Sequence, residues 1–351
     1  MKFLIKVIKK FFELGVIDFF KFCTKRFKDI FFLDFLTTNL IDKNQEIKAP
    51  IILISQIQRS GGTLLSQLFD GHKEICAYPN ELTIWRPKWK LKNLDKRFEN
   101  LDNDYIKFFA LKSEYKKESK SKWNKTYNFY FNLNAQKKIF NNYLIKKNGQ
   151  RNILNAYFTS FFYSWLNYKD NLRKKKYVSI FIPRVNMENE SLKYFFKHYP
   201  DGKFITIVRD PLDWLASALK HDPKSYSDFE RALTLWKKST ISSMTLIKKK
   251  NVIGITFYDL IKNTEKTINK ICKKIDITPD SILTTPTFNS EPILSDSSFK
   301  SVEGKIDKRT LNRKNNFKQK KFKKLLQKKN INILLKDCNK LYNHFYKLKK
   351  I

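Results

Sequence analysis

The sequence Gln58-Arg59-Ser60-Gly61-Gly62-Thr63-Leu64-Leu65 contains two adjacent glycines between an apolar run and a segment of helical periodicity. The preceding run, residues 50–57, is rich in β-branched side chains and predicts a buried strand, whereas the apolar spacing of residues 64–69 predicts a helix. Adjacent glycines let successive backbone N–H groups face one concavity, and a helix N-terminus adds its positive dipole end. This strand, turn and helix therefore predict an anion site.

The loop differs from the Walker A loop of ATP-binding proteins, in which Lys and then Ser or Thr follow the second glycine. Here Thr63 follows Gly62 directly, and the basic residue, Arg59, precedes the glycines. The phosphate cradle is present without the ATP signature. Taken alone, the loop is also compatible with a tight Gly-Gly turn that simply leads into a helix.

A second segment has the same order of elements. Residues 203–208 read as a buried strand, Pro211 suits the first turn of a helix, and the apolar residues that follow continue that helix. Arg209 ends the strand, and Ser217 lies eight positions later on the helix. An Arg fork and a hydroxyl that converge on one phosphate would explain both residues. A helix start with an Arg–Asp pair is the structural alternative.

Together the two segments resemble the sulfotransferase family, whose members use 3′-phosphoadenosine 5′-phosphosulfate (PAPS). In that family a basic-Ser-Gly-x-Thr loop holds the 5′-phosphosulfate, and an Arg with a Ser eight residues later holds the 3′-phosphate. Both spacings occur here, in the expected order. The resemblance implies that the nucleotide is bound by Arg59, Ser60, Gly61, Gly62, Thr63, Leu64, Arg209 and Ser217.

Weaker matches extend the resemblance from about Ala49 to about Leu311. Residues 252–260 look like the family's late strand that ends in Tyr-acidic-acidic-Leu, whose Tyr contacts the adenine. One acidic residue is missing here, so only Tyr258 and Asp259 carry over. Ser298 and Gly304, with Arg309, are similar to a loop that closes over the nucleotide in bacterial and Golgi-type members.

The resemblance also implies the catalytic groups. Arg59 takes the family's basic position in the loop and would stabilise charge on the bridging oxygen. Members that act on glycans and protein tyrosines use a Glu placed after the first helix, which corresponds to Glu81. The Lys-Thr-His segment of cytosolic members is replaced by residues 181–186, which contain no histidine. We therefore expect Glu81 to be the general base and Arg184 a second cation near the sulfonate, with a surface carboxylate or helix cap as the alternative for Glu81.

Composition is compatible with an enzyme but is less specific. The chain of 351 residues carries a formal charge of +38, from 71 basic and 33 acidic residues. Such a charge alone suggests nucleic acid, a membrane surface or an acidic polymer as partner. The excess is mostly Lys and is spread along the whole chain, and no nucleic-acid-binding motif accompanies it. We therefore expect no nucleic-acid partner.

The cysteines and histidines indicate no metal site. Cys23, Cys76, Cys272 and Cys338 form no close pair, and the four histidines lack metal-ligand spacing. The cysteines read as core residues in a reducing compartment or as incidental. The prediction is a metal-independent, cytoplasmic protein.

The chain divides into three parts. Residues 1–46 alternate aromatic residues with Lys and Arg, without an apolar run long enough to span a membrane or to form a signal core. They are expected to pack on the catalytic domain or to lie on an anionic membrane as a peripheral contact. Residues 47–316 form the catalytic domain, in which 85–150 are a variable helical cover on the acceptor side. Residues 317–351 are expected to be a C-terminal helical closure.

These observations predict a three-layer α/β/α fold with a central parallel sheet, like that of P-loop sulfotransferases, with candidate core strands at residues 51–57, 177–182, 203–208 and 252–257. The predicted reaction is in-line transfer of a sulfuryl group from PAPS to a hydroxyl or amine acceptor, with carbohydrate as the leading class. A P-loop kinase or nucleotide phosphohydrolase is one alternative. A non-enzymatic basic module that binds nucleic acid or an acidic polymer is the other.

Overall fold

The computed structural model describes residues 46–82, 131, 133–144, 149–165, 168–172, 175–293, 302–312 and 324–349. The predictions for residues 1–45, for most of 85–150 and for Ser298 lie outside these ranges. The described chain falls into two units: a helical hairpin, and a larger α/β unit that contains both predicted phosphate-binding segments.

The larger unit is built on a five-stranded parallel sheet with the strand order β2-β3-β1-β4-β5. Its strands are β1 (Ile51–Ile54), β2 (Ile75–Glu81), β3 (Tyr177–Phe181), β4 (Lys203–Val208) and β5 (Val252–Thr256). β1, β3 and β5 are buried at every position, as expected for strands covered on both faces. The sequence predicted four of the five strands. It missed β2, because a proline inside an apolar run argues against a strand, and Pro79 is tolerated here at the edge of the sheet.

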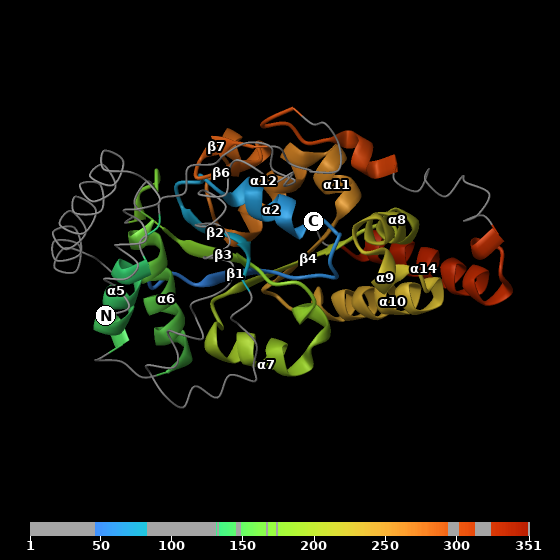
Figure 1. The fold of residues 1–351 in the computed structure, drawn as a ribbon, viewed down its shortest axis with the longest axis horizontal. Helices are drawn as coiled ribbons and strands as arrows, with labels where there is room; N and C mark the ends of the chain where they lie inside the picture. The colour runs from blue at the N-terminus through green and yellow to red at the C-terminus, as the bar shows by residue number, and fades with distance from the viewer. Residues whose placement is uncertain are drawn as a thin grey trace, which may run out of the picture. The chain divides into compact units, whose positions relative to one another are not determined.

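Helices cover both faces of the sheet, as Figure 1 shows. On one face lie α2 (Gly62–Phe69), α11 (Phe257–Lys262) and α12 (Thr264–Ile275). On the other lie α7 (Asn189–His198) and α10 (Phe229–Leu246). The short η2 (Val185–Met187) precedes α7, and α8 (Pro211–His221) and α9 (Pro223–Tyr226) precede α10. The predicted three-layer α/β/α architecture is confirmed.

The core on the α2 face ties the loop at residues 55–61, the predicted phosphate loop, to the sheet. Leu64, Leu65 and Leu68 of α2 pack in one cluster with Ile52, Ile205 and Ile255 of the strands and with Phe257 and Leu260 of α11. Fully burying such side chains contributes roughly 1.5–3 kcal/mol each. The N-termini of α2 and α11 are thereby held next to each other beyond the carboxyl ends of β1 and β5.

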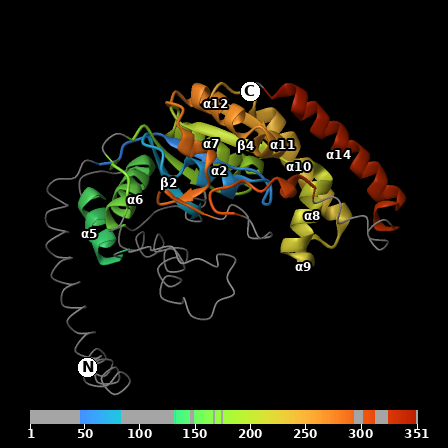
Figure 2. The same cartoon turned by 90° about the horizontal axis from the view of Figure 1, so that it is seen from above.

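Smaller elements follow the sheet in the chain. They are η3 (Ser281–Thr284), the two-stranded antiparallel pair β6 (Thr287–Phe288) and β7 (Glu291–Pro292), and α14 (Lys329–Leu348). Figure 2 shows α14 as a long helix, which packs along α10. Cys338 and Phe345, which the sequence places on one face of this helix, are both buried.

The helical hairpin is formed by α5 (Leu133–Leu144) and α6 (Gln150–Ser164). Aromatic side chains pack along α6: the ring centroid of Phe161 lies 5.1 Å from that of Phe131, 6.3 Å from that of Tyr157 and 6.1 Å from that of Trp165. α5 lies in the segment 85–150 that the sequence assigns to the acceptor side, and this assignment stays a prediction.

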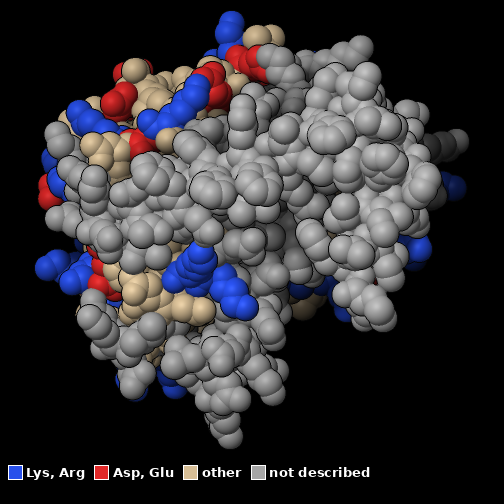
Figure 3. All heavy atoms as spheres, turned by 60° about the vertical axis from the view of Figure 1, so that its left-hand side comes forward, with Lys and Arg blue, Asp and Glu red and all other residues tan. Residues whose placement is uncertain are grey.

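On the face drawn in Figure 3, the described Lys and Arg side chains are interspersed with Asp and Glu. None of the helices in the described ranges combines the length and the apolar character that a membrane span needs.

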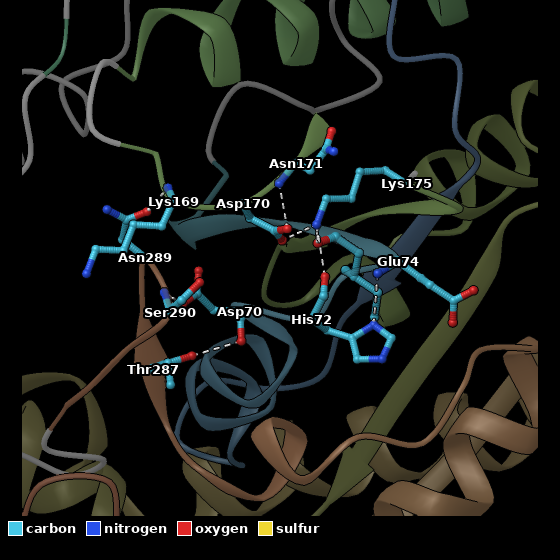
Figure 4. A network of polar contacts seen from close by, with 11 residues as sticks. Asp70, His72, Glu74, Lys169, Asp170, Asn171, Lys175, Thr287, Asn289 and Ser290 are labelled. Atoms are coloured by element: carbon cyan, nitrogen blue, oxygen red, sulfur yellow. Dashed lines mark hydrogen bonds and ion pairs between the residues drawn. The ribbon is translucent and has the colours of Figure 1, made fainter. Parts of the chain in front are cut away.

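A buried polar network holds the turn between α2 and β2 (Figure 4). Lys175 Nζ pairs with Asp170 and donates to the carbonyl oxygens of His72 at 2.9 Å and Ile75 at 3.0 Å. At the C-terminus of α2, Asp70 Oδ2 accepts a hydrogen bond from Ser290 N at 2.8 Å. Because β2 starts at this turn, the network fixes where β2 begins and thereby helps to place Glu81 at its other end.

Burial raises the pKa of Asp70 from its ordinary value of 3.8 to about 6, against the hydrogen bonds from residues 287–290. The folded state therefore favours the protonated carboxyl. Below the unfolded-state pKa the group costs nothing, and the penalty for burying its charge grows until the pH passes the folded-state pKa.

We predict that the wild type loses stability relative to Asp70→Asn as the pH rises from about 4 to about 6. The difference in the free energy of unfolding between the two proteins should change by up to about 3 kcal/mol over this range. Urea denaturation at a series of pH values measures this difference. Asp201→Asn, at an exposed position, is the control. Parallel pH curves for the wild type and Asp70→Asn would show that the Asp70 carboxyl does not titrate in this window.

Candidate active site

The site is built around the loop between β1 and α2, which reverses through left-handed backbone conformations. Arg59 has φ 67° and Gly61 has φ 104°. Glycine adopts such angles freely, whereas a residue with a side chain pays about 1–3 kcal/mol when it is held in a sparsely populated region. The surrounding packing holds Arg59 in this geometry, as is common where a loop serves a ligand.

Both glycines lie where no side chain would fit. A Cβ on Gly61 would lie 2.6 Å from Phe257 Cδ2, and one on Gly62 would lie 2.1 Å from Gln56 Nε2 and 2.3 Å from Phe181 Cε2. The first intrahelical bond of α2 runs from Leu65 N to Gly61 O at 3.0 Å, and no side chain caps the helix. The N–H groups of residues 62–64 therefore have no partner within the helix, and such a helix end favours an anion, as the sequence predicted.

Ser60 adds a further polar group to the loop. Its side chain is fully buried, and its Oγ has no hydrogen-bond partner. A buried hydroxyl without a partner costs about 1–3 kcal/mol, so an anion bound in the loop would recover a lost interaction.

The second predicted segment meets the loop in space. Arg209, at the end of β4, donates from Nη1 to Arg59 O at 3.0 Å, and Arg59 Nε lies 3.4 Å from Ser217 Oγ of α8. Arg209 and Ser217 are 4% and 1% exposed. Two segments far apart in the sequence thus share one buried site with an Arg from each.

The environment of Arg209 includes two residues that the sequence did not reveal. Its guanidinium carbon lies 4.1 Å above the ring centroid of Phe257, and Nη2 donates to Thr310 O at 2.7 Å. The same ring fills the space beside Gly61, so Phe257 contacts both halves of the site. The sequence pattern in this segment indicated the neighbouring Tyr258 and not Phe257, and no motif indicated Thr310.

Arg184 follows β3 and reaches the loop from the other side. It has φ 71°, its N–H donates to Gln56 O at 2.9 Å, and its guanidinium donates to Gln58 Oε1 and to Tyr226 Oη, the latter at 3.2 Å. These bonds hold a second cation beside the loop.

Glu81 is the last residue of β2 and is paired in register with Phe181 of β3. Burial raises the pKa of its carboxyl above the ordinary value, and the positive charge of Arg59 opposes that shift. A raised pKa suits a general base, and the role of Glu81 as the base stays a prediction.

Comparison with known proteins agrees with this geometry. The family model described as the sulfotransferase family matches residues 50–281. The chain belongs to the sulfotransferase family. No curated protein matches the chain. The family assignment rests on the sequence match, which spans β1, the loop, Arg209 and β5.

Solved structures of two sulfotransferase domains and of a retinol dehydratase are distantly similar to this sulfotransferase. The sulfotransferase domain of the curacin biosynthetic pathway is 16% identical, with a TM-score of 0.44 over 84% of this chain and 98% of that chain. The domain of the Synechococcus PCC 7002 olefin synthase is also 16% identical, with a TM-score of 0.45 over 79% and 97%. Retinol dehydratase in a complex with retinol and PAP is 11% identical, with a TM-score of 0.33 over 89% and 85%.

The remaining predicted residues of the enzyme are placed as follows. Thr63 is exposed at the loop, whereas the side chain of Leu64 is buried in the core, so that only its backbone faces the loop. Tyr258 is 37% exposed, with Lys262 Nζ 5.4 Å from its ring centroid. Gly304 packs against Pro292 of β7, which pairs with β6. Thr287 of β6 donates a hydrogen bond to Gln67 O near the C-terminus of α2, so Gly304 lies away from the loop. Asp259 forms an ion pair with Lys349 and accepts a hydrogen bond from the Thr256 hydroxyl.

Among the described residues, no three His, Cys, Asp or Glu side chains gather in a metal-binding arrangement. His72 bonds through Nε2 to Thr278 O at 2.9 Å and accepts from Glu74 N at 3.2 Å through Nδ1. Its ring therefore stabilises the turn before β2.

We predict that Gly62→Ala destabilises the enzyme by about 1–3 kcal/mol, because the new methyl group overlaps Gln56 and Phe181. Helix propensity alone would favour Ala over Gly by about 1 kcal/mol, so the steric overlap decides the sign. Thr63→Ala, at the exposed neighbouring position of the same turn, is the control and changes stability little. Urea denaturation measures the stability of both variants. A Gly62→Ala variant as stable as the wild type would contradict the close approach of Gln56 and Phe181 to position 62.

Proposed function

We propose that this sulfotransferase moves a sulfuryl group from PAPS to a hydroxyl or amine acceptor, with carbohydrate as the favoured class. The observation that carries the proposal is the contact between the two phosphate-binding segments, through Arg209 to Arg59 O and through Arg59 to Ser217. One anion site at a helix N-terminus and a second at a buried Arg and Ser suit a nucleotide that carries phosphate groups at both its 5′ and 3′ positions.

The residues fit such a nucleotide on three counts. The glycine cradle has no room for a Cβ, the first N–H groups of α2 are not used by the helix, and buried Ser60 Oγ has no partner. We assign the 5′-phosphosulfate to residues 59–64, the 3′-phosphate to Arg209 and Ser217, and the adenine side to Tyr258. Ser298 and Gly304 remain predictions for the covering loop.

The chemistry required of the protein is positioning, positive charge and proton removal. PAPS, when bound, supplies a sulfuryl group whose bond to the bridging phosphate oxygen breaks as the acceptor attacks, which leaves adenosine 3′,5′-bisphosphate. Arg59 and the N–H groups of the loop stabilise the charge on the leaving oxygen. Glu81 takes the proton from the acceptor, and Arg184 orients the sulfonate.

The position of Glu81 supports its role as the base. β2 and β3 lie on one side of β1, and β4 with Arg209 lies on the other. A nucleotide with its 3′-phosphate at Arg209 would direct its reactive end across the loop toward β3 and β2. Glu81 ends the outermost strand on that side, where an acceptor would enter.

We predict that Arg209→Ala and Ser217→Ala weaken binding of adenosine 3′,5′-bisphosphate far more than binding of adenosine 5′-phosphate, which lacks the 3′-phosphate. A hydrogen bond to a charged group contributes about 1.5–3 kcal/mol, which corresponds to about ten- to a hundredfold in affinity. Isothermal titration calorimetry measures both ligands, and Arg231→Ala on the exposed side of α10 is the control. Equal losses of affinity for the two ligands would show that Arg209 and Ser217 do not bind the 3′-phosphate.

We predict that Glu81→Gln lowers kcat by about a hundredfold or more and leaves nucleotide affinity nearly unchanged, because Gln keeps the size but cannot accept a proton. In the wild type, kcat/KM falls on the acid side as Glu81 is protonated, at a pH above the ordinary pKa of glutamate because burial raises its pKa. Glu190→Gln, an exposed carboxyl on α7, is the control. Near-wild-type turnover of Glu81→Gln would place the base elsewhere.

A further inference from the structure

Gln56 is a buried side chain for which the fold provides no hydrogen bonds. It lies two residues after the end of β1 and is 1% exposed, and both its Nε2 and its Oε1 lack a partner. Buried amides in folded proteins nearly always bond to a neighbour, because an unmade bond costs stability. An apolar side chain of the same length would fill this space without that cost.

The amide lies directly against the phosphate loop. A Cβ on Gly62 would fall 2.1 Å from Gln56 Nε2 and 2.3 Å from the ring of Phe181. Only glycine at position 62 therefore allows the amide to approach the first turn of α2, where the N–H groups are not used by the helix. The unpartnered amide of Gln56 thus lies next to the predicted anion site at the first turn of α2.

Gln56 lies on the side of the loop away from Arg209. Its neighbour Phe181 belongs to β3, and Phe181 pairs in register with Glu81 of β2. Arg184, which follows β3, donates its N–H to Gln56 O at 2.9 Å. Arg209 and Ser217, by contrast, follow β4 on the opposite side of β1.

We propose that the Gln56 amide binds the transferable sulfonate of the donor and so distinguishes it from the desulfated product. This inference rests on the proposed function, which directs the sulfonate toward β3 and Glu81. The amide N–H groups are hydrogen-bond donors suited to sulfonate oxygens, and a bond to a charged group is stronger than a neutral one. The product, adenosine 3′,5′-bisphosphate, has no sulfonate and does not use this contact.

The test compares the affinities of PAPS and adenosine 3′,5′-bisphosphate by calorimetry in the absence of acceptor. We expect Gln56→Met to weaken PAPS about ten- to a hundredfold and to change product affinity less than about twofold. Gln56→Glu, which keeps the size but opposes an anion, should weaken PAPS further. Gln67→Met is the matched control: it removes an amide whose buried oxygen lacks a partner, but from the C-terminal part of α2, away from the loop, and it should leave the ratio of the two affinities unchanged.

Denaturation of the same variants supplies a second readout. Because Met fills the space without an unmade hydrogen bond, we expect Gln56→Met to be at least as stable as the wild type. If Gln56→Met fails to fold, Gln56→Glu and Gln56→Asn decide the question by the same affinity ratio.

The outcomes separate this inference from the proposed function. A wild-type protein that binds neither nucleotide would overturn both. A wild-type protein that binds both, with variants that keep its affinity ratio or lose both ligands equally, would overturn only the role of Gln56. A selective loss of PAPS affinity in Gln56→Met and Gln56→Glu, but not in Gln67→Met, supports it.

Discussion

The bonds of the buried Arg209 guanidinium connect the parts of the site. It donates to the carbonyl oxygens of Arg59 and Thr310 and lies over the ring of Phe257. These contacts link β4 to the phosphate loop, to the segment that contains Thr310, and to α11. A buried positive charge is costly unless polar groups surround it, and these contacts supply such groups. The same residue is the one proposed above to bind the 3′-phosphate.

Several features near the loop cost stability, and the nucleotide proposed to bind there would offset part of that cost. Arg59 and Arg184 both have positive φ, and Ser60 and Gln56 are buried with unpartnered polar atoms. Strain and unmade hydrogen bonds persist where the surrounding fold is strong enough to hold them. Here the buried strands and the core cluster around α2 supply that strength.

The position of Glu81 depends on a different part of the molecule. Lys175 bonds to the turn between α2 and β2, and β2 then pairs with β3 as far as Phe181. A carboxylate at the end of an edge strand is thus placed by a buried ion pair at the strand's other end. Burial raises its pKa while Arg59 opposes the shift, so its basicity depends on how near the loop it lies.

The sequence by itself determined the fold class and located the two segments predicted to bind phosphate, because these depend on local signals: buried β-branched runs, adjacent glycines, and an Arg at a strand end with a Ser eight positions later on the following helix. Four of the five strands follow from the same patterns, whereas β2 does not, since Pro79 interrupts its run and only pairing with β3 makes it a strand. The contact of Arg59 with Ser217, the ring of Phe257 between Gly61 and Arg209, and the unpartnered amide of Gln56 were decided only by the tertiary structure. Each joins residues distant in the chain, and no local pattern encodes which side chains the packing of α2, α11 and the sheet brings together.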